Sequence, residues 1–267
     1  MSTLSYAMTD SATMLRRQLR HMLRYPSMTL MLAGLPIVLL LLFVYVFGGT
    51  LGAGLGGFSG GFSGGRAEYV DYVTPGILLI TVASAAQGTA ISVAMDMTEG
   101  IIARFRTMAI ARVSVLTGHV LGSMLQTMLS MAVVIGVALL IGFRPTAGLA
   151  EWIAAIGVLA MITLALTWLS VALGMVSKSV ETASNLPMFL MLLPFLGSGF
   201  VPTDSMPAGL RWFAEYQPFT PVNETLRGLL LGSPIGSSAA QAVAWCAAIG
   251  LVGYLWAKRL FIARTRP

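Results

Sequence analysis

Residues 152–177, WIAAIGVLAMITLALTWLSVALGMVS, run without a single charged side chain. A helix of about 20 apolar residues is long enough to cross the hydrocarbon core of a bilayer. The whole chain is 57% apolar and only 10% charged, whereas ordinary soluble domains are about 25% charged. The pattern therefore predicts an all-α membrane protein. Five further windows are charge-free and of sufficient length: 25–65, 72–95, 113–143, 182–203 and 228–257.

These windows predict six transmembrane helices in one transmembrane domain that occupies residues 1–267. Within it we expect a cytoplasmic interfacial helix in 1–27, a six-helix membrane domain in 28–257 and a cytoplasmic tail in 258–267. The expected helix cores are 28–48, 74–95, 118–142, 152–176, 183–201 and 238–257.

The basic residues predict the orientation of the chain in the membrane. If the N-terminus is cytoplasmic, only four of the 16 lysines and arginines fall in outside segments, namely Arg66, Arg144, Arg211 and Arg227. Cytoplasmic segments carry the excess of basic residues in membrane proteins, so we expect both termini in the cytoplasm. The net charge of +6 is then explained by basic residues that lie next to the anionic inner leaflet. It is therefore no evidence that the protein binds nucleic acid. Arginine far outnumbers lysine, which is typical of a GC-rich bacterial genome. We expect the protein in the bacterial plasma (inner) membrane.

The segment before the first span has an amphipathic pattern. Met14, Leu15, Leu19, Met22 and Leu23 share one helical face, and four arginines lie on the other before Pro26. This pattern is typical of a helix that lies in the membrane interface. A disordered basic tail is the alternative.

A second amphipathic segment, Asp96 to Arg112 (DMTEGIIARFRTMAIAR), joins the second and third predicted spans on the cytoplasmic side. Read as a helix that starts near Gly100, it has an apolar face of Ile101, Ile102, Phe105 and Met108. Asp96 and Glu99 are expected at the helix start, where carboxylates complement the exposed N–H groups and the helix dipole. An apolar face on a cytoplasmic loop predicts that another molecule covers it.

The fifth predicted span contains Pro187 and Pro194. Proline interrupts the helical hydrogen bonds, so this span is expected to be kinked or broken. The break could serve as a hinge, or neighbouring helices could simply absorb it. Residues that could line a substrate path are Gln87 in the second span and Asn185, Met188, Phe189, Met191 and Phe195 in the fifth; the apolar ones would equally suit lipid or helix packing.

The segment from Met206 to Leu231 is too polar to cross the membrane and too apolar for a solvated loop. It predicts short external interfacial or re-entrant helices at 207–215 and 221–231. Trp212, Phe213, Tyr216 and Phe219 are expected to anchor them at headgroup depth, where amphipathic aromatic rings gather. In the first external loop, the glycines of 56–65 predict a flexible linker.

The sequence lacks the motifs of several kinds of enzyme and transporter. No GxxxxGK[ST] phosphate-binding loop occurs, and the two histidines have no carboxylate or cysteine at metal-ligand spacing. Ionisable residues, which drive many ion-coupled carriers, are missing from the span centres. We therefore expect a non-enzymatic subunit without a cofactor of its own, powered by a separate protein.

Two motifs resemble one protein family. Glu99-Gly100 is followed by two apolar residues, then by Arg104, Arg106 and Ala111-Arg112. The later residues Met206-Pro207, Gln217-Pro-Phe-Thr220 and Asn223-Glu-Thr-Leu-Arg-Gly228 precede the last span. In this order and topology they resemble type-2 ATP-binding-cassette export permeases, and most of all the daunorubicin-resistance branch. The chain departs from the family in the run Met108-Ala-Ile-Ala-Arg112, which lacks the proline often found there.

The resemblance implies two permease subunits, as a homodimer or heterodimer, paired with two cytoplasmic ATPase subunits that bind ATP and Mg²⁺. It implies export of an amphipathic drug, lipid or glycolipid. By the match of the first motif, a coupling helix that docks on the ATPase would contain Glu99, Gly100, Ile101, Arg104, Phe105 and Arg106. The alternatives are a secondary transporter, a membrane-embedded enzyme or a membrane anchor.

Overall fold

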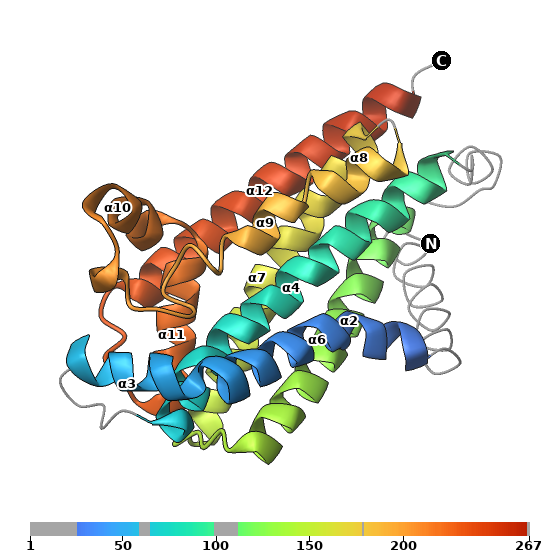
Figure 1. The fold of residues 1–267 in the computed structure, drawn as a ribbon. Coiled ribbons are helices and arrows are strands. Elements are labelled where there is room, and N and C mark those ends of the chain that lie inside the picture. Colours follow the sequence, from blue (N-terminus) through green and yellow to red (C-terminus); the bar gives the residue numbers. More distant parts are fainter. Residues whose placement is uncertain (1–25, 59–64, 99–111, 178, 266–267) are drawn as a thin grey trace.

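The computed structural model describes residues 26–58, 65–98, 112–177 and 179–265. Every regular element in these ranges is a helix (Figure 1). The elements are α2 (Pro26–Leu41), η1 (Leu42–Phe47), α3 (Gly48–Phe58), α4 (Arg66–Thr98), α6 (Arg112–Ile141), α7 (Leu149–Val176), α8 (Val180–Asn185), α9 (Met188–Leu192), η2 (Thr203–Ser205), α10 (Ala208–Tyr216), α11 (Phe219–Leu231) and α12 (Ser238–Thr265).

Five helices in the described ranges are long and apolar enough to cross a membrane. They correspond to the first, second, third, fourth and sixth predicted spans. The apolar stretches are Leu32–Ala53, Arg66–Thr98, Val120–Ile141, Leu149–Val176 and Ser238–Ile262.

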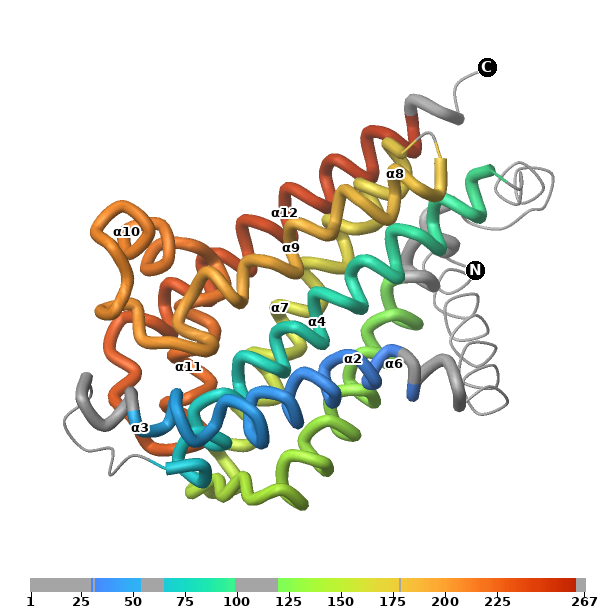
Figure 2. Tube along the Cα trace, viewed as in Figure 1, coloured from blue at the N-terminus to red at the C-terminus, as the bar shows by residue number. Residues whose placement is uncertain are grey.

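Helix α4 forms the centre of the bundle. It contacts α2, α6, α7 and α11, and most of its residues from Tyr69 to Ala86 are buried. Helix α12 packs along α7 (Figure 2). Small residues allow close helix contacts in membranes: a Cβ added at Gly174 of α7 would lie 2.5 Å from the Ala90 carbonyl oxygen of α4, and one at Gly253 of α12 would lie 2.6 Å from the Leu169 nitrogen of α7.

The first span is longer and less regular than predicted. After α2 the helix widens into the π-helical turn η1 and then continues as α3. Residues 56–58 are the end of α3, so the flexible-linker prediction is wrong for them, while 59–64 lie outside the described residues. The local reason is that Gly48 keeps helical backbone angles, and the chain therefore passes directly from η1 into α3.

The helix ends separate into two groups (Figure 1). The start of α2, the end of α4, the start of α8 and the end of α12 lie toward one end of the bundle. Helices α3, α10 and α11 lie toward the other. The end of α4 and the end of α12 therefore lie toward the same end of the bundle (Figure 1).

The predicted N-terminal interfacial helix and the six coupling residues from Glu99 to Arg106 lie outside the described residues. One part of the coupling prediction is wrong. Asp96 does not begin a new helix; it belongs to the last turn of α4, which continues through Thr98. The charge-free window of the second span ends at residue 95, whereas helix α4 continues past Asp96 to Thr98.

Candidate functional site

The fifth predicted span is broken, as its prolines indicated. Helix α8 begins at Val180 and is capped by Ser179, whose Oγ accepts a hydrogen bond of 3.2 Å from the Thr182 backbone N–H. It ends at Asn185, and Pro187 starts the short helix α9. After Leu192 the chain continues through turns instead of a helix. The region predicted as the fifth span, 183–201, therefore consists of two short helices and an unwound segment.

A polar contact joins this broken span to α4. The Gln87 Nε2 donates a hydrogen bond of 2.8 Å to the Ser184 carbonyl oxygen on α8. Ser184 directly precedes Asn185, whose side chain is exposed. Two of the predicted path residues, Gln87 and Asn185, are thus brought to one junction, although 98 positions separate them in the sequence.

The four apolar path residues lie in three different environments. Met188 and Phe189 are exposed on the outer surface of α9, Phe189 by 67%. Met191 is half-buried against the core. Phe195 instead stacks on Phe200, with 4.7 Å between the ring centroids. The structure therefore does not gather the six predicted residues into one cavity.

The burial of α4 changes along its length. From Tyr69 to Ala86 its residues are buried, apart from the half-buried Asp71 and Ser84. From Gln87 on, one face is open, with Gln87 and Ile91 half-buried and Gly88, Ser92 and Met95 exposed. We call this face, Gln87 to Met95, the α4 stripe. Polar groups that face lipid are costly, so a stripe with an amide and a hydroxyl is better suited to a water-lined path or a protein contact.

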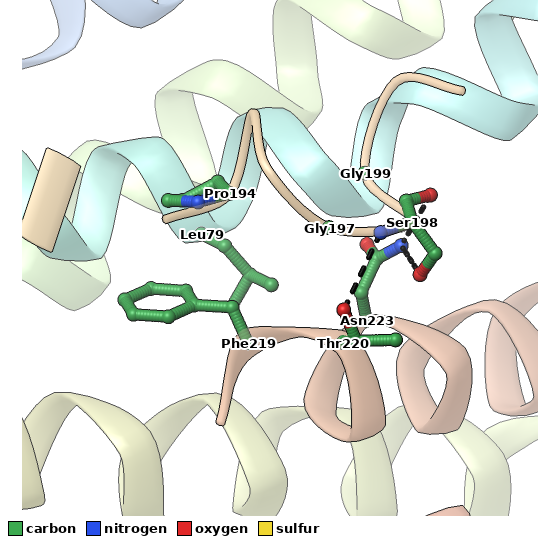
Figure 3. Close-up of a pocket in the computed structure, with 8 residues that line it drawn as sticks. All are labelled: Leu79, Pro194, Gly197, Ser198, Gly199, Phe219, Thr220 and Asn223. Carbon is green, nitrogen blue, oxygen red and sulfur yellow. Dashed lines mark hydrogen bonds between the residues drawn. The ribbon is translucent and has the colours of Figure 1, made fainter. Parts of the chain in front are cut away.

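A second polar cluster lies at the opposite end of the bundle, where the unwound segment meets α4 and α11. The Ser198 carbonyl oxygen accepts three hydrogen bonds, from Tyr72 Oη at 3.1 Å, Asn223 Nδ2 at 3.1 Å and an Arg227 guanidinium nitrogen at 2.8 Å. Asn223 also bonds the Ser198 hydroxyl at 3.2 Å (Figure 3). The adjoining gap, lined by Leu79, Pro194, Phe219 and Thr220 among others, has no room for a water molecule. The cluster is a packed junction.

Arg227 is the charged member of this cluster, and its side chain is only 8% exposed. One guanidinium nitrogen bonds Glu224 at 2.8 Å, and the other also bonds the Tyr72 carbonyl oxygen at 3.2 Å. The guanidinium carbon lies 3.8 Å from the centroid of the Tyr72 ring. A buried charge requires such partners. The sequence places Arg227 among the outside charges and within the motif Asn223–Gly228, but it does not show that the side chain is buried; its position in the apolar run TLRGLLL is the one local indication.

The two short helices before the last span match the predicted ranges closely, and they differ in burial. Helix α10 exposes Trp212, Phe213 and Tyr216, whereas α11 is largely buried. Phe219 is only 1% exposed, so its predicted role as a headgroup anchor is wrong. The reason is that α11 inserts between α4, α7 and α12 instead of lying on the surface.

Charges on the exposed part of α10 pair with one another. Arg211 bonds Glu215 at 2.7 Å and Asp204 at 2.5 Å. The hydrogen bond to Glu215 and the nearby charge of Asp204 raise the pKa of Arg211. Pairs this exposed contribute little to stability. Within the described ranges, no three His, Cys, Asp or Glu side chains come close enough to hold a metal ion.

The amino-acid sequence of the chain is similar to that of known membrane transport proteins. Residues 10–231 match the model of the ABC-2 type transporter family. The chain is 26% identical, over 228 residues, to the daunorubicin resistance ABC transporter permease protein DrrB1 of Streptomyces coeruleorubidus, a match that covers 85% of this chain and 77% of the relative. It is 24% identical, over 180 residues, to the probable doxorubicin resistance ABC transporter permease protein DrrC of Mycobacterium tuberculosis, covering 67% of this chain and 65% of that protein. The family match includes the broken span, the α4 stripe and the cluster around Arg227, and the chain belongs to the ABC-2 type transporter family.

Proposed function

We propose that this chain is the membrane-spanning permease subunit of an ATP-driven exporter that moves an amphipathic compound out of a bacterial cell. The observation that carries the proposal is the family match over residues 10–231, together with the absence of a phosphate-binding loop from the sequence. A permease of this kind needs a separate ATPase subunit, which would bind ATP and Mg²⁺. The chain itself would perform no covalent chemistry.

The segment between α4 and α6 is the proposed contact with that ATPase. The ends of both helices border it, and the end of α4 lies on the same side of the bundle as the end of α12 (Figure 1). An apolar face of Ile101, Phe105 and their neighbours would cost about 25 cal/mol per Å² if it stayed in water. A groove on the ATPase would cover this face, and Glu99 would favour the helix start at Gly100. Arg104 and Arg106 would bind acidic or carbonyl groups of the ATPase.

The α4 stripe and the neighbouring α8 are the proposed substrate path. Gln87 fixes α8 to α4, and Asn185 and Ser92 add polar atoms to an otherwise apolar surface. This surface is open in the single chain. A second permease subunit, as an identical or a related copy, would cover it and enclose a path between the two subunits. Met188 and Phe189 on α9 would extend the apolar part of that surface.

The cargo proposed first is an amphipathic drug. The names of two relatives refer to daunorubicin and doxorubicin resistance, and an exposed surface of mixed apolar and amide groups suits a planar molecule with polar substituents. A lipid or glycolipid would require the same mixed surface. Transport assays with a fluorescent anthracycline and with a fluorescent phospholipid would distinguish these cargoes.

The contact with the ATPase can be tested by co-purification with a candidate ATPase subunit. Phe105→Asp places a charge in the proposed apolar contact and should dissociate the ATPase. Glu99→Ala should leave assembly largely intact and should lower substrate-stimulated ATP hydrolysis. Phe213→Asp is the matched control, because Phe213 is exposed on α10 at the other end of the bundle. If Phe105→Asp binds and stimulates the ATPase as well as Phe213→Asp does, the proposed contact is wrong.

A further inference from the structure

The α4 stripe ends where another part of the chain covers α4. Before Gln87, toward the end of the bundle that holds α10 and α11, α4 is buried from Tyr69 to Ala86 almost without a break. Part of that cover is the unwound segment Leu193 to Val201, and α11 forms another part. The open surface of α4 is therefore closed at one end by a piece of chain without regular helix.

The unwound segment lies directly on the α4 backbone. A Cβ added at Gly76 of α4 would lie 2.6 Å from the Gly199 carbonyl oxygen, and one added at Gly199 would lie 3.4 Å from the Gly76 Cα. Only glycine leaves room for so close an approach. No side chain stands between the two backbones at this crossing, so nothing can pass between α4 and the segment in this arrangement.

Side chains replace the hydrogen bonds that a helix would have supplied to this segment. The Ser198 carbonyl accepts from Tyr72, Asn223 and Arg227, and the Leu193 carbonyl accepts from Gln217 Nε2 at 2.8 Å. Bonds from side chains can break without unwinding any helix. In addition, Asn223 Oδ1, Gln217 Oε1 and Arg227 Nε are buried and have no partner in this arrangement. Buried polar atoms are almost always bonded, so these three atoms could take up new hydrogen bonds if the segment moved.

We propose that the segment from Leu193 to Val201 is a gate at the external end of the substrate path, and that Arg227 is its latch. The inference rests on the function proposed above. In the closed state Arg227, Tyr72 and Asn223 hold the Ser198 carbonyl against α4. In the open state the Ser198 carbonyl leaves these donors, and Arg227 remains paired with Glu224 and with the Tyr72 ring. Pro194 and Gly197 lie in the irregular backbone of the segment, which has no regular helix to unwind when it moves.

Accessibility of position 198 to a water-soluble reagent reports on the gate independently of transport. The reporter is Ser198→Cys in a Cys246→Ser background, because Ser198 is only 3% exposed when the gate is closed. A membrane-impermeant maleimide is added outside intact cells. The resting protein should react slowly, and adding Arg227→Gln should accelerate labelling about tenfold or more, since a hydrogen bond from a charged group contributes at least one power of ten to such an equilibrium.

Arg144→Gln is the matched control. Arg144 also donates to backbone carbonyls, those of Leu139 at 2.8 Å and Phe143 at 3.0 Å, but neither belongs to the unwound segment. Labelling of the reporter thiol should not change in this variant. If Arg227→Gln fails to reach the membrane, Tyr72→Phe removes one donor and keeps the ring under Arg227, and it should accelerate labelling by a smaller factor. Equal labelling rates in the Arg227, Tyr72 and Arg144 variants would overturn the latch.

The gate also predicts that labelling depends on turnover. With the ATPase and cargo present, the reporter thiol should react faster during ATP hydrolysis than with a non-hydrolysable nucleotide. If the pair exports its cargo while the reporter thiol stays unreactive, the gate is wrong and the exporter function stands. If the pair neither hydrolyses ATP in response to cargo nor exports it, the proposed function fails, and the resting comparison of Arg227→Gln with Arg144→Gln still tests the latch.

Discussion

Gly174→Ala should destabilise the bundle, because Gly174 of α7 lies directly against the α4 backbone. The added Cβ would lie 2.5 Å from the Ala90 carbonyl oxygen and 3.0 Å from the Val93 Cβ. An ordinary carbon contact is about 3.5–4.0 Å, so the two helices would have to separate by roughly 1 Å. The nearest atom belongs to the helix backbone and cannot rotate away. Overpacking of this kind costs about 1–3 kcal/mol.

Gly157→Ala is the matched control for this prediction. It makes the same substitution in the same helix, at a position where the added Cβ meets nothing within 4 Å. Alanine is the better helix former by about 1 kcal/mol, so this variant should be neutral or stabilised. The measurement is the loss of monodisperse protein on heating in detergent, followed by size-exclusion chromatography. Equal midpoints for the two variants would refute the tight α4–α7 packing.

Three further predictions concern the path and the topology. Pro194→Ala should favour a regular helix in the unwound segment and lower transport without preventing membrane insertion; unchanged export at equal expression would make the break purely structural. Gln87→Leu should remove the contact with α8 and weaken transport more than Gln126→Leu on α6, as measured by the KM for cargo, and equal effects would count against the path. Single cysteines at Ser59 and Thr265 in a cysteine-free background should react from opposite sides of the membrane, and reaction of the cysteine at position 265 with an impermeant reagent outside intact cells would contradict the predicted orientation.

The sequence predicted the long helices well because a bilayer imposes a simple requirement. Charge-free windows such as 152–177 correspond directly to helices such as α7, whose apolar stretch is Leu149–Val176. The break in the fifth span was also predictable, because proline acts on its own helix. In both cases the cause lies within a few residues of the effect.

Features that depend on distant contacts were not predictable. Arg227 and Tyr72 are 155 positions apart, and nothing in either local sequence shows that they pair. Phe219 was expected at the surface because an aromatic residue in a short amphipathic helix is typical of an anchor, but α11 inserts into the bundle and buries it. Asp96 was assigned to the wrong helix because an acidic residue after an apolar run is typical of a helix start, and α4 continues past it.

The central claim is that this chain forms a transport path and that a separate ATPase powers it. The most direct test is uptake of a fluorescent anthracycline into inside-out membrane vesicles that contain the chain and the candidate ATPase, together and each alone. We expect uptake that requires ATP and both proteins, and that disappears when the phosphate-loop lysine of the ATPase is replaced. Uptake by the chain alone, driven by a proton gradient and indifferent to ATP, would contradict the account.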